Sequence, residues 1–105
     1  MRILFDQGVP VPLRRYLGDH SIDTAYEKGW SRLSNGDLLD AAEQAGYELL
    51  ITTDQNLPYQ QNLGRKNLAI LALPTTSWPR ILSLIEDVRA AVDQIAPGDY
   101  RQLPA

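Results

Sequence analysis

Aspartates follow two short apolar runs of this chain. Residues 3–5 lead directly into Asp6, and residues 49–53 lead into Asp54. Such runs are typical of buried strands in a parallel sheet, whose carboxyl ends meet at one edge, where α/β folds place ligand sites. Two carboxylates brought together there repel each other unless they share a cation or a proton. Hard divalent cations prefer carboxylate oxygens, so the pair indicates a metal-dependent phosphodiester site, unless each aspartate only caps the following element.

The elements that must hold these aspartates alternate along the chain. Apolar or alternating runs predict strands over residues 2–6, 21–26, 49–53 and 68–73. Helices are predicted between and after them, namely one opened by Pro10 or Pro12 and ended by Gly18, one from a cap at Ser34 or Asn35 to Gly46, a short helix or loop over 56–62, and a last helix from Pro79 through Ile95. This alternation predicts an α/β fold with a parallel sheet and helices on both of its faces.

The length of 105 residues suits one small domain with a single core. We expect residues 1–105 to form that domain, with an ordered core over about residues 2–96 and a loose tail over 97–105. The apolar stretches are too short to span a membrane, and the first residues read as a strand rather than as a signal peptide. The chain has no cysteine, which excludes disulfides and thiolate metal sites. The simplest expectation is a cytoplasmic protein.

The formal net charge of −3 argues against a surface that holds duplex DNA by bulk electrostatics. It does not exclude a nuclease, because an acidic metal site lowers the net charge by itself. Arginine supplies most of the basic residues, and only Lys28 and Lys66 are lysines. Arginine suits bidentate phosphate contacts, although ordinary surface pairing is the favoured interpretation.

The motifs at residues 4–6, 37–39 and 51–54 are similar to those of the PIN-like superfamily. More closely, the chain resembles a short bacterial PIN-like family whose chains begin with a strand that ends in aspartate, and this resemblance extends from Arg2 to about Ile95. It implies a three-layer α/β/α fold with a parallel four-stranded sheet. It also implies a metal-dependent ribonuclease that uses Mg²⁺ or Mn²⁺. Many PIN domains are the toxins of VapBC-type toxin–antitoxin pairs, so RNA, a small antitoxin and a second copy in a homodimer are the implied partners.

The resemblance assigns the catalytic and metal-binding roles to Asp6, Asp37 and Asp54. Asp6 matches the first-strand aspartate, Asp37 the acid in the first turn of the second helix, and Asp54 the aspartate of the Thr-x-Asp element. Glu27, just after the second strand, is a candidate fourth acid. In this interpretation Asp6 and Asp54 bind the cation, and Asp37 completes the site or orients a water.

Three amides stand where related chains often carry acids, namely Gln7, Asn35 and Asn56. Their amide oxygens are candidate neutral ligands of a hard cation or candidate partners of its ligands, but they add no charge to the site, and an amide cannot serve as a general base. The site is therefore a weakened metal site, a specialised one, or one that binds without cleaving. The alternative function is a non-catalytic PIN-like binding module with a degenerate acidic site. A response-regulator-like or nucleotide-binding domain ranks last, because the chain lacks a Gly-rich phosphate loop and a Lys after residues 68–73.

Other side chains are weaker candidates for contact with nucleic acid. Arg65 and Lys66 are candidates for phosphate contacts, and Trp30 for stacking on bases, although surface exposure and core packing are the favoured alternatives. The single histidine, His20, is interpreted as a turn residue, because it precedes a strand whose other end faces the predicted site. Thr52 is able to bond a carboxylate, but threonine at a strand end is usually an ordinary strand residue.

Overall fold

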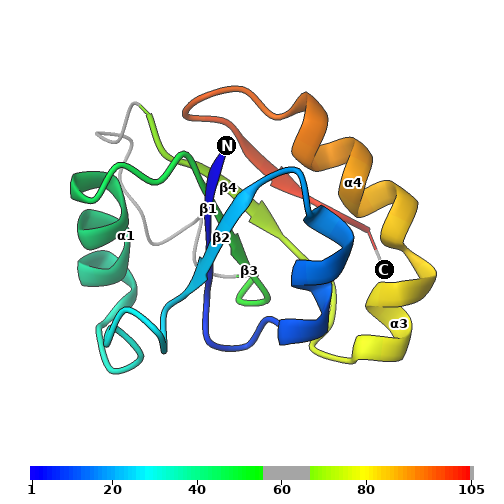
Figure 1. Cartoon of the computed structure of the whole chain (residues 1–105), viewed down its shortest axis with the longest axis horizontal. Helices are drawn as coiled ribbons and strands as arrows, with labels where there is room; N and C mark the ends of the chain where they lie inside the picture. Colours follow the sequence, from blue (N-terminus) through cyan, green and yellow to red (C-terminus); the bar gives the residue numbers. More distant parts are fainter. Residues whose placement is uncertain (56–66, 105) are drawn as a thin grey trace.

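The computed structural model describes residues 1–55 and 67–104, and the predicted element over residues 56–62 lies outside them. The elements follow in the order β1 (Arg2–Phe5), the 3-10 helix η1 (Val11–Leu17), β2 (Ser21–Thr24), α1 (Asn35–Gln44), β3 (Leu49–Thr52), β4 (Ala69–Ala72), α3 (Trp78–Ser83), α4 (Ile85–Gln94) and β5 (Tyr100–Gln102) (Figure 1). None of the helices within these described ranges has the length and apolar character that crossing a membrane requires.

The five strands form one all-parallel sheet in the order β2-β1-β3-β4-β5. The α/β class and the parallel sheet are therefore confirmed. In the centre of the sheet, Phe5 of β1 is in register with Ile51 of β3. The residues that follow these two strands consequently leave the sheet side by side, at its carboxyl edge.

The prediction of four strands and a loose tail after residue 97 is wrong, because Tyr100–Gln102 form β5 beside β4. A turn directs the chain into this strand: Gly98 has a φ of 78°, and the Asp99 amide donates to the Ala96 carbonyl (3.0 Å). All residues of β5 are exposed, so no alternation of apolar side chains marks the strand in the sequence. Backbone hydrogen bonds to β4 hold it in place.

Helices pack on both faces of the sheet (Figure 1). Alternate strand residues such as Ile3, Phe5 and Ile51 point to the face that η1, α3 and α4 cover. Their neighbours Leu4 and Leu50 point to the opposite face, where the apolar side of α1 covers them. Burial on both faces explains why β1 and β3 are continuously apolar.

The helix predicted from Pro79 through Ile95 is divided at Leu84 into α3 and α4. In an unbroken helix the Arg80 carbonyl would accept from the Leu84 amide. Here the Ser83 hydroxyl donates to that carbonyl (2.6 Å), and the Leu84 amide donates to Ile81 instead (2.9 Å). Serine competition for the backbone carbonyl thus coincides with the break.

Candidate functional site

Asp6 leaves the sheet directly after β1 and is fixed by three hydrogen bonds. Its amide donates to the Ile51 carbonyl (2.9 Å), which extends the β1–β3 pairing by one residue. Its Oδ1 accepts from the Gln7 amide (2.7 Å), and its Oδ2 accepts from the Thr52 hydroxyl (2.8 Å). Both carboxylate oxygens therefore have a defined direction, set by the backbone on one side and by β3 on the other.

Thr52 joins the two aspartates through a single hydroxyl. This side chain is completely buried at the end of β3. Its Oγ1 donates to Asp6 Oδ2 and accepts from the Asp54 amide (3.0 Å). From the sequence, Thr52 was expected to be an ordinary strand residue. The feature that indicates its role is a polar residue at the last position of an otherwise apolar strand.

Asp54 connects this pair to the start of α1. Its Oδ2 accepts from the Asn35 amide nitrogen at 3.2 Å. Asn35 is the first residue of α1, and that helix is capped by Ser34, whose Oγ accepts from the Asp37 amide (3.3 Å). The ends of β1 and β3 and the beginning of α1 therefore meet at the carboxyl edge of the sheet.

Asp37 lies in the first turn of α1, two residues after Asn35, with an exposed side chain. A carboxylate in that turn interacts favourably with the helix dipole, which is sufficient to account for an acid at this position. Within the described part of the chain, no three acidic or histidine side chains form a group suited to a metal ion. The Thr52 hydroxyl thus joins Asp6 to Asp54, and Asp37 belongs to the same helix turn as Asn35.

The donors at this edge suit a hard cation. Two carboxylates stand at the ends of adjacent strands, beside the Thr52 hydroxyl, and all three groups present oxygen, whereas Asn35 turns its amide nitrogen toward Asp54. A carboxylate oxygen keeps a second lone pair when it accepts one hydrogen bond. Oxygen-only donor sets are those that Mg²⁺ and Mn²⁺ prefer. A divalent ion held by Asp6 and Asp54 is thus chemically compatible with the site.

Glu27, the candidate fourth acid, forms an ion pair with a neighbouring arginine. Its carboxylate pairs with Arg14 of η1 (2.7 Å) and also accepts from the Thr24 amide (3.0 Å). The hydrogen bond from Arg14, followed by that from the Thr24 amide, lowers the pKa of Glu27 below the ordinary glutamate value. Glu27 and Asp6 line one cavity of about 310 Å³, so the ion pair borders the acidic site without joining it.

The Arg14–Glu27 pair predicts an acid-dependent loss of stability. Because the folded state lowers the pKa of Glu27, the stabilisation is present above the ordinary glutamate pKa and is lost as the pH falls through the folded value. We expect Glu27→Gln to destabilise the protein at pH 6 and to have a smaller effect at pH 3. Urea unfolding of both proteins at the two pH values measures this. An equal difference at both values would contradict it.

The aromatic candidates pack against neighbouring rings. Trp30 meets Tyr47 edge to face, with ring centroids 6.2 Å apart, and the Lys28 Nζ lies 5.5 Å from the centroid of the Trp30 ring. Trp78 packs against Tyr16 at 5.6 Å. Packing against these neighbouring rings is sufficient to explain the presence of both tryptophans.

His20 immediately precedes β2, and its Nε2 is 4.0 Å from an Asp93 oxygen. That is the amino edge of the parallel sheet, opposite the acidic site. The remaining sequence candidates, Asn56, Arg65 and Lys66, lie outside the described residues.

Gly8 and Gln55, which were not among the candidates from the sequence, also lie near the site. A Cβ at Gly8 would clash with Thr53 Oγ1, so a larger residue at position 8 would require the Thr53 side chain to move. Gln55 donates to the Leu73 carbonyl (3.1 Å) and accepts from the Gln102 amide. It thereby connects the loop after Asp54 to the ends of β4 and β5.

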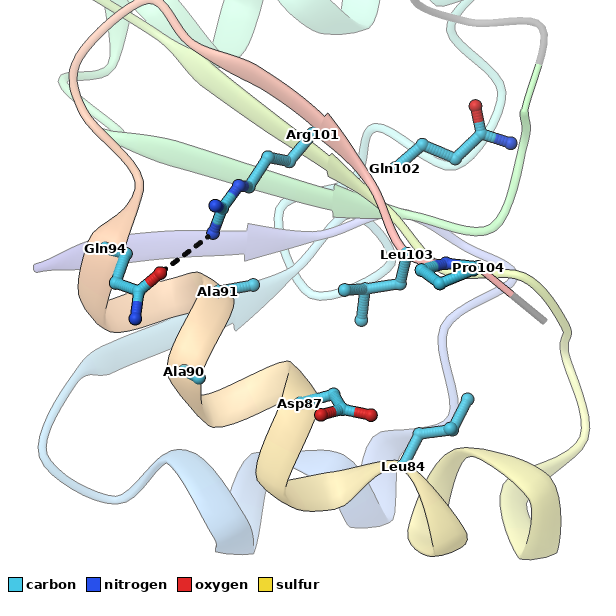
Figure 2. A pocket seen from close by; sticks show the side chains of 9 residues that line it. All are labelled: Leu84, Asp87, Ala90, Ala91, Gln94, Arg101, Gln102, Leu103 and Pro104. Carbon is cyan, nitrogen blue, oxygen red and sulfur yellow. Dashed lines mark hydrogen bonds between the residues drawn. The ribbon is translucent and has the colours of Figure 1, made fainter.

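A separate cavity of about 380 Å³ lies between α4 and β5 (Figure 2). Arg101 of β5 donates to Gln94 of α4 across one end of it (3.4 Å), and Asp87 supplies a carboxylate. The described residues that line this cavity include none of the three predicted catalytic aspartates. We therefore place the candidate site at the carboxyl edge of β1 and β3 rather than in this larger space.

Comparison of the chain with protein-family models, curated proteins and solved structures finds no significant match. The geometry of the acidic edge and the motifs in the sequence are therefore the features that point to a function.

Proposed function

We propose that this chain is a PIN-like, metal-dependent ribonuclease domain of the type found as the toxin in toxin–antitoxin modules. The observation that supports this most strongly is the pair of aspartates, Asp6 and Asp54, connected through the buried Thr52 hydroxyl at the carboxyl edge of a parallel sheet. The helices on both faces of that sheet are compatible with the three-layer PIN-like architecture.

In this proposal Asp6 and Asp54 hold Mg²⁺ or Mn²⁺, with Asp37 completing the acidic set from the first turn of α1. A bound divalent ion would supply an activated water and neutralise charge that develops on the phosphate. Thr52 fixes the direction of the Asp6 carboxylate, and Asn35 does the same for Asp54. RNA is the proposed substrate, and a small antitoxin and a second copy of the chain are the proposed protein partners, in the cytoplasm.

A non-catalytic PIN-like binding module is the second candidate. The contact that favours it is the bond from the Asn35 amide to Asp54 Oδ2, because it places a neutral donor on an oxygen that a cation would use. Gln7 likewise contributes its backbone amide to Asp6 rather than an additional acid. Both candidates use the same edge of the sheet, and they differ in whether a cation binds and RNA is cleaved.

Manganese should stabilise the folded protein if the proposed site is correct. At about 100 times its Kd, a ligand that binds only the folded state contributes about 2.7 kcal/mol, or roughly 10 °C in Tm for a domain of this size. We expect this shift for the wild type and not for Asp6→Asn/Asp54→Asn. Thermal unfolding with and without Mn²⁺ measures it, and Asp19→Asn, an exposed aspartate that precedes β2, is the matched control.

The same proteins then separate the two candidates. Cleavage of single-stranded or structured RNA that requires Mn²⁺, stops with a chelator and is lost in Asp54→Asn supports the ribonuclease. Stabilisation by Mn²⁺ without cleavage supports the binding module. No Mn²⁺ effect on the wild type, together with an aspartate variant at least as stable, would remove the metal site altogether.

A further inference from the structure

Tyr26 is an exposed aromatic residue next to the acidic edge. Its side chain is 78% exposed, the largest value among the large hydrophobic residues that the structure describes as exposed. Val11 of η1, on the same cavity, is 56% exposed. Burying an exposed aromatic surface is favourable, so such a residue beside a cavity indicates a contact surface.

Reciprocal hydrogen bonds fix the turn that presents Tyr26. The Thr24 hydroxyl accepts from the Glu27 amide (3.0 Å), and the Glu27 carboxylate accepts from the Thr24 amide (3.0 Å). This is the arrangement of a capping box, in which two backbone donors are satisfied at once. Arg14 then holds the Glu27 carboxylate from η1. Tyr26 therefore extends from an ordered turn, which lowers the entropic cost of using its ring for binding.

The cavity beside Tyr26 combines apolar walls with polar groups at two places. Val9 and Val11 contribute apolar surface, Asp6 lies at the acidic edge, and the Arg14–Glu27 pair supplies hydrogen-bond donors and acceptors. Its volume of about 310 Å³ is at the lower limit for small-molecule sites, which are about 300–1,000 Å³. This volume is large enough to receive one nucleobase.

We propose that this cavity receives one unpaired nucleobase of a single-stranded RNA, stacked on the ring of Tyr26. The proposal rests on the ribonuclease function proposed above and adds to it a base-binding pocket centred on Tyr26. Single-stranded nucleic acids are recognised largely by stacking on aromatic side chains, with hydrogen bonds to the base edges. Because Asp6 lines the same cavity, a base held there places the adjoining phosphate near the acidic edge.

Nucleosides test the base pocket without any phosphate or metal. In chelator-containing buffer, titration of ¹⁵N-labelled protein with adenosine, uridine or ribose is followed by NMR. We expect the nucleosides, but not ribose, to shift the amide signals of residues 24–27. The apparent affinity should fall at least tenfold in Tyr26→Ala and persist in Tyr26→Trp. Tyr100→Ala, which removes an exposed tyrosine from β5, is the matched control and should bind as the wild type does.

Three results would overturn the proposal: no nucleoside-dependent shifts at residues 24–27, equal shifts with ribose, or unchanged affinity in Tyr26→Ala. The absence of nucleoside-dependent shifts would indicate that the exposed surface around Tyr26 binds a protein partner instead. Since the assay uses neither Mn²⁺ nor phosphate, its outcome is separate from that of the metal experiment. If the nucleosides bind but Mn²⁺ does not stabilise the protein, the base pocket is supported and the metal-dependent nuclease is contradicted. If Mn²⁺ stabilises the protein but no nucleoside binds, the metal site is supported and the base pocket is contradicted.

Discussion

Replacing Thr52 with valine is expected to lower the free energy of unfolding by about 2–4 kcal/mol, although the two side chains have nearly the same shape. The Thr52 hydroxyl is completely buried and makes two hydrogen bonds, one to the Asp6 carboxylate and one from the Asp54 amide. Valine removes both bonds, and hydrogen bonds to charged groups are the more valuable kind. Urea unfolding at pH 7 measures the difference.

Thr52→Ser is the control, because it keeps the hydroxyl and removes only a methyl group. We expect it to retain most of the stability that valine loses. If Thr52 also positions the aspartates for a cation, the serine variant keeps the Mn²⁺-dependent rise in Tm and the valine variant does not. Equal stability of the valine variant and the wild type would show that the buried hydroxyl contributes nothing to holding the two strand ends together.

The proximity of Asp6 and Asp54 is the part of the site that the sequence predicts best. Continuous apolar runs identify β1 and β3 as buried parallel strands, and parallel strands release their next residues at one edge. The connection through Thr52 depends on the register of Phe5 with Ile51, which no periodicity in the sequence reveals. The Thr24–Glu27 turn is different, since its Thr-x-x-Glu spacing is a capping-box signature and was available in the sequence.

The fifth strand could not be predicted for a related reason. Hydrophobic periodicity detects a strand only when one of its faces is buried, and all three residues of β5 are exposed. Its position comes from backbone pairing with β4 and from the turn at Gly98. The other four strands of the sheet, by contrast, each bury at least one side chain, and their positions follow from that pattern.

Above pH 10, ionisation of Tyr47 is expected to lower the free energy of unfolding. This side chain is only 2% exposed, and its hydroxyl donates to Asp23 Oδ2 at 2.5 Å. Burial, followed by the hydrogen bond to Asp23, raises the pKa of Tyr47 to about 12. An unfolded tyrosine ionises near pH 10, so the unfolded state releases this proton first and stability falls as the pH rises from 10 to 12. The two-unit difference corresponds to about 2–3 kcal/mol.

Tyr47→Phe removes this ionisation while it keeps the ring. We expect the difference in unfolding free energy between wild type and variant to shrink by about 2–3 kcal/mol between pH 9 and pH 12, because all other groups contribute equally to both proteins. Urea unfolding across this range measures the difference, and parallel profiles would contradict it. Asp23 belongs to the edge strand β2, and Leu4 of β1 lies in register with it. The Tyr47–Asp23 bond therefore joins β2 to the segment before β3, across β1.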